Sequence, residues 1–194
     1  MYLNCKTFYS FCYGTFSTSA LVEAAVEQGV STLALTNINS TYDHWEFVKL
    51  CREKNIKPVL GLEIHNDQVF QYLLLAKNNK GLAWINEFLS DHLLNKTPFP
   101  ASPDAPQDVF VIYDLKKAST ELLPNERIGI RASELTKLFK IDNFDQYVIR
   151  QPVTVQDKEY YYVHCLLRAI VKPADKREVP IRKPCTKRAN PNNP

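Results

Sequence analysis

The sequence predicts an α/β fold, in which strands and helices alternate along the chain. The clearest signal lies in residues 29–40, GVSTLALTNINS, where the apolar run Thr32–Leu35 passes directly into a polar cluster. A helical pattern that ends at Gly29 precedes this strand, and another that begins near Ser40 follows it. In a closed barrel of such βα units, the residues just past the strand ends face the active site. We therefore expect Asn37 to lie where any chemistry would take place.

The rest of the chain continues this alternation. The expected strands are residues 2–8, 32–35, 57–64, 70–76, 108–113, 128–130 and 147–155. The expected helices are residues 17–29, 43–54, 79–94, 133–140 and 157–171. In the second helix, Trp45, Val48 and either Leu50 or Cys51 are candidates for the buried side. Pro152 interrupts the last strand, which indicates a sheet edge or a bulge.

Composition is that of a globular protein. The chain has 194 residues, 45% of them hydrophobic and 23% charged, enough for one domain with a substantial core. Five scattered cysteines without a CxxC pair argue against a disulfide framework and favour the cytoplasm. No apolar run approaches the ~20 residues of a membrane span, and the net charge of +3 is too small to indicate nucleic-acid binding. We expect a packed domain over residues 1–171 and a basic, proline-rich tail over residues 172–194 that is unfolded.

Three segments resemble a known family: KTFYSFCYGTFSTSALVEAAVEQGVSTLALTNINS, IKPVLGLEI and YLLLAKNNKGLAWINEF. They are similar to the polymerase and histidinol phosphatase (PHP) domain at the N-terminus of bacterial DNA polymerase III α subunits. The resemblance covers residues 2–95, and weaker similarity at residues 125–135 and 152–160 extends it toward residue 170. It implies a distorted TIM-like (β/α)7 barrel of the PHP type.

The resemblance also implies that a metal centre has been lost. Active family members hold about three metal ions through His, Asp and Glu side chains, and such ions activate water and stabilise phosphate oxyanions. The corresponding positions here are Asn4 and Lys6 for the first motif, Asn37 and Ile38 for the second, Glu63, Gln71, and Asp157 and Glu159 for the last. No histidine occupies a matched position, and the Lys6 ammonium would repel a metal ion. The resemblance thus implies neither a metal cofactor nor a catalytic residue in this domain.

Simpler roles compete for several side chains. We expect Glu63 to pair with Lys6, in a salt bridge whose desolvation offsets much of its attraction. Surface or helix-packing roles are expected for the four histidines, His44, His65, His92 and His164. Tyrosines 160–162 could stack on bases, but packing of a helix against the barrel explains them more simply. Cys5 could be a reactive thiol, although no histidine lies beside it in the sequence.

The resemblance therefore predicts the N-terminal portion of a replicative DNA polymerase III α subunit. There, the domain would be a scaffold packed against the palm and thumb regions and a docking site for a separate proofreading exonuclease subunit. The parent chain would be a cytoplasmic, Mg-dependent nucleotidyltransferase that binds DNA, but nothing in these 194 residues resembles its aspartate-bearing palm, so this portion alone is not expected to be an enzyme. One alternative is a metal-dependent phosphoesterase, either a proofreading nuclease or a pyrophosphatase. Another is a free-standing binding protein, and metal content separates the first two possibilities.

Overall fold

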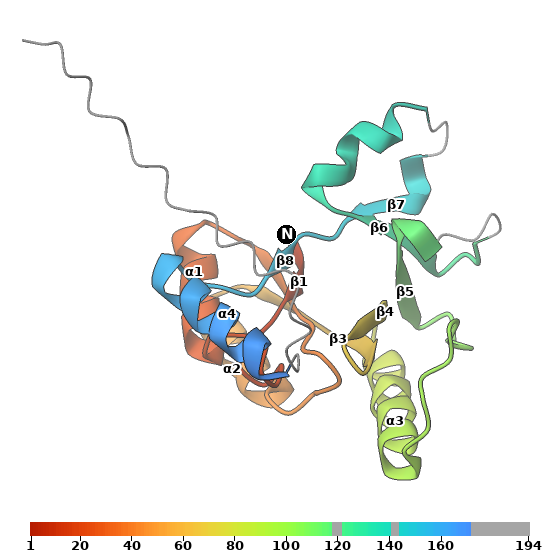
Figure 1. Cartoon of the computed structure of the whole chain (residues 1–194), viewed down its shortest axis with the longest axis horizontal. Helices are drawn as coiled ribbons and strands as arrows, with labels where there is room; N and C mark the ends of the chain where they lie inside the picture. The colour runs from red at the N-terminus through yellow and green to blue at the C-terminus, as the bar shows by residue number, and fades with distance from the viewer. Residues whose placement is uncertain (118–121, 141–143, 172–194) are drawn as a thin grey trace, which may run out of the picture.

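The computed structural model describes residues 1–117, 122–140 and 144–171, which form one curled sheet with helices on its outer side (Figure 1). The tail expected to be unfolded, residues 172–194, lies outside the described residues. The strands are β1 (Tyr2–Cys5), β2 (Thr32–Leu35), β3 (Lys57–Asn66), β4 (Val69–Ala76), β5 (Val109–Asp114), β6 (Glu126–Ile130), β7 (Tyr147–Ile149) and β8 (Pro152–Val153). The α-helices are α1 (Thr18–Glu27), α2 (His44–Glu53), α3 (Asn79–Asn95) and α4 (Lys158–Val171). Short 3-10 helices are η1 (Leu115–Lys117), η2 (Ala132–Lys140) and η3 (Phe144–Gln146).

The eight strands follow the order β7-β6-β5-β4-β3-β2-β1-β8 and curl into half a barrel. Strands β8, β1, β2 and β3 run parallel to one another, and so do β5, β6 and β7. Strand β4 runs antiparallel to both β3 and β5, and the two-residue turn of Asp67 and Gln68 reverses the chain between β3 and β4. The expected α/β class is confirmed, but the antiparallel β4 interrupts a strict series of parallel βα units.

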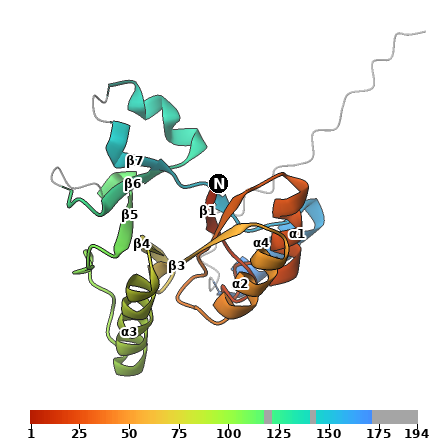
Figure 2. The same ribbon diagram turned by 180° about the vertical axis from the view of Figure 1, so that it is seen from behind.

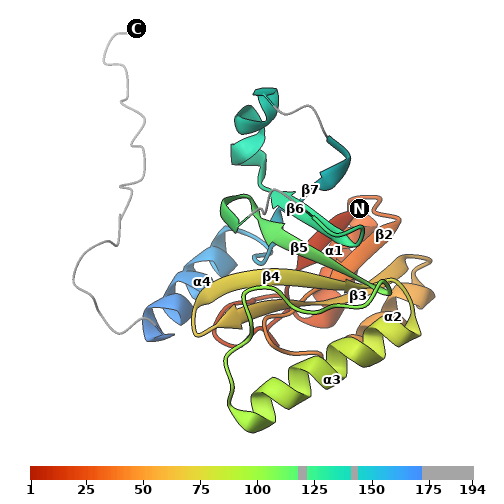
Figure 3. The same cartoon turned by 90° about the vertical axis from the view of Figure 1, so that its right-hand side faces the viewer.

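Two outer cores and one inner core hold most of the sheet, and a small cluster around Ile128 and Ile130 adds to them at β6. Helices α1 and α2 pack on the outer side of β1 and β2, through residues such as Leu21, Phe47 and Leu35 (Figure 2). Helix α3 covers β3, β4 and β5 in the same way, as the side view shows (Figure 3). The inner face carries a smaller apolar cluster, Ala34, Leu73, Leu75 and Ile112. The alternation of side chains along each strand therefore separates a helix-facing side from an interior side.

This alternation decides which residues of β1 reach the interior. Cys5 is fully buried in the helix-facing core together with Leu33 and Leu35, so its neighbours Asn4 and Lys6 point the other way. Burial raises the pKa of the Cys5 thiol to about 12. A thiol with such a pKa is almost entirely protonated at neutral pH, which argues against the reactive role considered from the sequence.

The last predicted strand is two strands in the structure. Residues 147–155 were expected to be continuous, but β7 pairs with β6 at one end of the sheet and β8 pairs with β1 at the other. Between them the chain turns at Arg150 and Gln151, and the Arg150 N–H donates to the Ile130 carbonyl at 2.8 Å. This corner links the two ends of the curled sheet (Figure 1). Pro152 starts the edge strand β8, consistent with its missing N–H.

Two helices present different faces from those expected. In α2, Trp45 is 82% exposed, and the buried residues are His44, Phe47 and Cys51, which share one face at helical spacing. Helix α4 contains no buried residue, so its tyrosines do not pack into the half-barrel as expected. Residues 133–140, predicted as a helix, lie in the 3-10 helix η2. None of the described helices combines the length and the apolar character that crossing a membrane requires.

Candidate functional site

The carboxyl ends of β1 and β3 bring together three of the residues singled out from the sequence. Lys6 Nζ lies 2.6 Å from Asn4 Oδ1 and 2.7 Å from Glu63 Oε2. Asn4, Lys6 and Glu63 are each at most 4% exposed, and Thr36 at the end of β2 donates to Asn4 Oδ1 at 3.1 Å. The salt bridge expected between Lys6 and Glu63 is therefore confirmed as a buried contact.

A histidine completes this cluster. His65 Nε2 lies 2.7 Å from Glu63 Oε1, so both oxygens of the carboxylate are engaged. Burial alone would raise the pKa of Glu63, but attraction to Lys6 and the hydrogen bond from His65 outweigh it and lower the pKa to about 2. Burial lowers the pKa of Lys6 and Glu63 opposes that shift, so the Lys6 charge depends on its partner. The cluster is a carboxylate held between two nitrogen donors.

Asn37 lies in a separate hydrogen-bond network on the helix-facing side. Its Oδ1 accepts from the Thr7 N–H and from Ser10 Oγ, each at 2.8 Å. Its Nδ2 donates at 2.8 Å to Asp43 Oδ1, and Asp43 in turn accepts from Thr18 Oγ1 at 3.0 Å. All five side chains are at most 2% exposed. Asn37 thus ties the loop after β1 to the start of α2, which is a structural role.

The remaining predicted positions are Ile38, Gln71, Asp157 and Glu159, and Ile38 contacts both groups through its backbone. Ile38 is half-buried, forms a bridge with Glu63, and donates its N–H to Ser10 Oγ at 3.0 Å. The Gln71 side chain is 8% exposed and donates to the Val69 carbonyl at 3.0 Å. Asp157 and Glu159 are exposed at the start of α4, where Asp157 Oδ1 accepts from the backbone N–H of Glu159 at 2.8 Å. The sequence thus identified the centre of the cluster but not its full composition.

Several residues of the site were missed. His65 was expected at the surface or in helix packing, although its position two residues after Glu63 on one strand places both side chains on the same face. Arg150 gave no signal, because it lies at a corner that the sequence suggests is strand. His164 on α4 donates from Nδ1 to the Tyr13 carbonyl at 2.6 Å. All three line a pocket of about 320 Å³ above the Lys6 and Glu63 pair.

The residues of this pocket do not fit the metal cluster that active family members hold. Within residues 1–117, 122–140 and 144–171, no three His, Cys, Asp or Glu side chains are arranged to hold a metal ion. The oxygens of Glu63 contact an ammonium and an imidazole, and the neighbouring positions hold amide and cationic side chains. Amides are weak ligands for Zn, Mn or Fe, and a fixed cation repels a dication.

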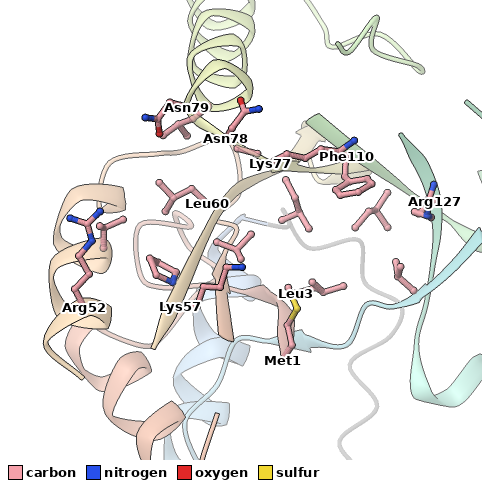
Figure 4. A pocket seen from close by; sticks show the side chains of 18 residues that line it. Met1, Leu3, Arg52, Lys57, Leu60, Lys77, Asn78, Asn79, Phe110 and Arg127 are labelled. Atoms are coloured by element: carbon pink, nitrogen blue, oxygen red, sulfur yellow. The ribbon is translucent and has the colours of Figure 1, made fainter. Parts of the chain in front are cut away.

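A larger cavity, of about 690 Å³, lies at the opposite end of the half-barrel (Figure 4). It is lined mainly by apolar side chains, among them Leu3, Val59 and Phe110 of the inner face. The cationic side chains that line it are Arg52, Lys57, Lys77 and Arg127. None of the sequence-predicted site residues reaches this cavity.

Comparison with known proteins identifies the family. The model of the PHP domain matches residues 3–160, so this chain belongs to the PHP domain family. Among curated relatives, the DNA polymerase III subunit alpha of Staphylococcus aureus (strain COL) is 24% identical over 167 residues, which are 84% of this chain and 15% of that protein. The DNA polymerase III subunit alpha of Mycoplasma genitalium is 32% identical over 88 residues, which are 44% of this chain and 10% of that protein. The chain therefore spans about 15% or less of the length of these relatives.

A similarity was also found among solved structures. A proposed metal-dependent phosphoesterase from Bifidobacterium adolescentis matches with a TM-score of 0.38 and 24% sequence identity, over 48% of this chain and 31% of that protein.

Proposed function

We propose that this PHP domain works without metal ions, as a structural part of a DNA polymerase III α subunit. The observation that carries the proposal is the position of Lys6 Nζ, 2.6 Å from Asn4 and 2.7 Å from Glu63. A metal ion bound to Glu63 would meet this ammonium at contact distance, where two positive charges repel strongly in a buried site. Similarity to polymerase α subunits over 84% of the chain supports the choice of parent protein.

In that parent protein, other domains would carry out nucleotidyl transfer on DNA, with Mg, in the cytoplasm. The half-barrel would be a distorted form of the TIM-like (β/α)7 barrel, with its polar residues at the carboxyl ends of the strands. This assignment agrees with the outer helices and with the cluster around Glu63.

A surface on α4 supports the scaffold role. Tyr162, Leu166 and Ile170 follow one another at a spacing of four residues, which places them along one face of the helix. Each is more than half exposed, and an apolar stripe of this kind is typical of a docking surface. We propose that another domain of the α subunit covers this stripe, and that a proofreading exonuclease subunit docks elsewhere on the same domain.

Elemental analysis tests the metal-free state. After dialysis, the protein should contain no stoichiometric Zn, Mn or Fe. Glu63→Gln would remove the central carboxylate, and Glu87→Gln, which changes an exposed carboxylate on α3 outside every family motif, is its matched control. Two or more metal ions per chain that are lost in Glu63→Gln but kept in Glu87→Gln, together with hydrolysis of a phosphodiester, would favour the metal-dependent phosphoesterase and contradict the proposal.

A substitution on α4 tests the scaffold role. In the isolated chain, Leu166→Asp should change the melting temperature little, because Leu166 is 66% exposed. In the full-length α subunit the same change should lower the melting temperature, since it would place a carboxylate in the interface. Leu94→Asp, at an 81% exposed position on α3, is the control. Equal effects of the two substitutions in the full-length protein would argue against α4 as the docking face.

A further inference from the structure

The pocket above Glu63 is lined by more cationic side chains than carboxylates. Among the described residues that line it, four side chains are cationic and one is a carboxylate. The cations are Lys6, Arg131, Arg150 and Arg168. Glu63 is already engaged by Lys6 and His65, so no carboxylate of the pocket is left for the three arginines.

Arg150 shows this imbalance most clearly. Its side chain is 2% exposed, and its guanidinium lies 4.1 Å over the ring of Phe70. In the described part of the chain, Arg150 Nε is buried without a hydrogen-bond partner. The nearest carboxylate oxygen, Asp114 Oδ2, lies 3.4 Å from Nη2, which is long for a charge-assisted hydrogen bond. This contact with Asp114 is an ion pair, but it leaves Nε unsatisfied, and buried polar groups are normally hydrogen-bonded, so the guanidinium can still bind an anion.

Arg131 and Arg168 approach the same pocket from two other elements. Arg131 follows the end of β6 and is exposed, and Arg168 lies on α4 with its guanidinium 4.9 Å from the ring of Tyr13. With Arg150 at the corner between β7 and β8, the three guanidinium groups come from separate parts of the chain. Donors from separate directions suit an anion with several oxygens better than a single carboxylate.

From this arrangement we infer that the pocket is a metal-free binding site for a phosphate-type oxyanion, held by Arg150, Arg131 and Arg168 above the Lys6 and Glu63 pair. Arginine forks match the geometry of phosphate oxygens, and Lys6 adds positive charge at the back of the site. A volume of about 320 Å³ is at the small end for ligand sites, which favours a small anion or a terminal phosphate over a whole nucleotide chain. None of the three arginines occupies a position that corresponds to a family metal ligand.

The test is binding of inorganic phosphate to protein that has been freed of metals and kept in EDTA. Isothermal titration calorimetry at constant ionic strength, with chloride as the reference anion, should detect saturable binding of one phosphate per chain. Arg168→Gln and Arg131→Gln should each weaken binding about tenfold, because each removes a charge-assisted contact. Both positions lie near the mouth of the pocket and are not fully buried, so these variants should remain folded even if Arg150→Gln does not.

Arg52→Gln is the matched control, since Arg52 stands at the apolar cavity at the other end of the half-barrel. It should leave phosphate binding unchanged. Equal weakening by Arg52→Gln and Arg168→Gln, or no saturable binding of phosphate by the wild-type protein in EDTA, would overturn the inference. Binding that needs added Mn would also overturn it, and separate metal analysis would then show whether the proposed metal-free function fails as well.

A second titration distinguishes the source of the phosphate. A short oligonucleotide with a 5′-phosphate is compared with the same oligonucleotide ending in a hydroxyl group. Binding of inorganic phosphate but of neither oligonucleotide identifies a free anion as the ligand. Binding that also requires the 5′-phosphate identifies a nucleic-acid terminus, and both results support the oxyanion site. Equal binding of the two oligonucleotides, without inorganic phosphate, would contradict it.

Discussion

The carboxyl end of the half-barrel contains two polar groups that differ in how completely they are satisfied. Around Asn37, the amide oxygen and the amide nitrogen both have partners within the protein, and the network ties a loop to α2. Around Glu63, one carboxylate lies among several cations, and Arg150 Nε has no partner among the described residues. The first group faces the helices and the second faces the interior. Polar side chains beside the packed helices have their hydrogen bonds satisfied within the protein, whereas those beside the open interior can still bind a ligand.

The largest expected effect comes from removing the carboxylate of the second group. Glu63→Gln leaves the buried Lys6 ammonium without its carboxylate partner, which should lower the free energy of unfolding by about 3–5 kcal/mol. Urea unfolding at pH 7 measures this loss. Glu159→Gln, at an exposed position, should change the same quantity by less than about 0.5 kcal/mol.

A double-mutant cycle shows whether this loss of stability arises from the interaction between Lys6 and Glu63. Lys6→Met alone should also destabilise the protein, but less, since His65 still donates to Glu63. If Lys6→Met and Glu63→Gln together cost as much as the sum of the single changes, the two side chains are not coupled and the description of the site is wrong.

The second effect is a dependence of stability on pH. Because the pKa of Glu63 falls from 4.5 to about 2 on folding, its contribution is fully present above pH 4.5 and is lost as the pH falls through about 2. That shift corresponds to about 3 kcal/mol. The difference in unfolding free energy between wild type and Glu63→Gln should therefore shrink between pH 5 and pH 2. A constant difference over that range would mean that Glu63 is not ionised in the folded protein.

The contrast between the two groups also explains what the sequence could predict. Strand and helix periods predicted the α/β class and the elements up to α3, and the family resemblance placed Asn4, Lys6 and Glu63 at one site. Both depend on local pattern. The position of Arg150 depends instead on the corner between β7 and β8. The sequence does not reveal this corner, because residues 147–155 read as one continuous strand.

Burial on helices was predicted less well for a similar reason. Trp45 has the largest apolar side chain in α2, yet it is 82% exposed, because the hydrogen bonds of Asp43 fix where the helix starts and which face meets the sheet. His65 is the instructive exception. Its alternation with Glu63 on β3 could have placed it in the site from the sequence alone.

The third effect separates a structural asparagine from a lost metal ligand. Asn37→Asp restores the acidic residue of the family pattern, but its new carboxylate would lie against Asp43, whose Oδ1 now accepts from Asn37 at 2.8 Å. Repulsion between two buried carboxylates should lower the free energy of unfolding by about 2 kcal/mol at pH 7. The loss should be smaller at pH 4, because a carboxylate pair gains a proton more readily than either carboxylate alone.

The chain contains a matched control for this substitution. Asn95 Nδ2 also donates to an aspartate at 2.8 Å, Asp91 Oδ1, but on the exposed surface of α3. Asn95→Asp should cost only about 0.5 kcal/mol, since water screens the repulsion. If Asn37→Asp is no more costly than Asn95→Asp, or if it stabilises the protein when Mn is added, then Asn37 lies in a metal site and not in a structural network.

The smallest expected effect is that Cys5 does not react with an alkylating reagent in the native protein. This result tests the register of β1, on which both polar groups depend. Cys5 lies between Asn4 and Lys6, and its thiol, with a pKa of about 12, should be ionised in only about one molecule in 10⁴ at pH 8. Iodoacetamide should therefore label the exposed Cys165 in the native protein and leave Cys5 unmodified until urea unfolds the chain. Mass spectrometry of the peptides measures both. A shift of one residue would turn every side chain of β1 to the opposite face, so native labelling of Cys5 at the rate of Cys165 would mean that Asn4 and Lys6 face the helices. In that case, the ion pair with Glu63 and the pocket above it could not form as described.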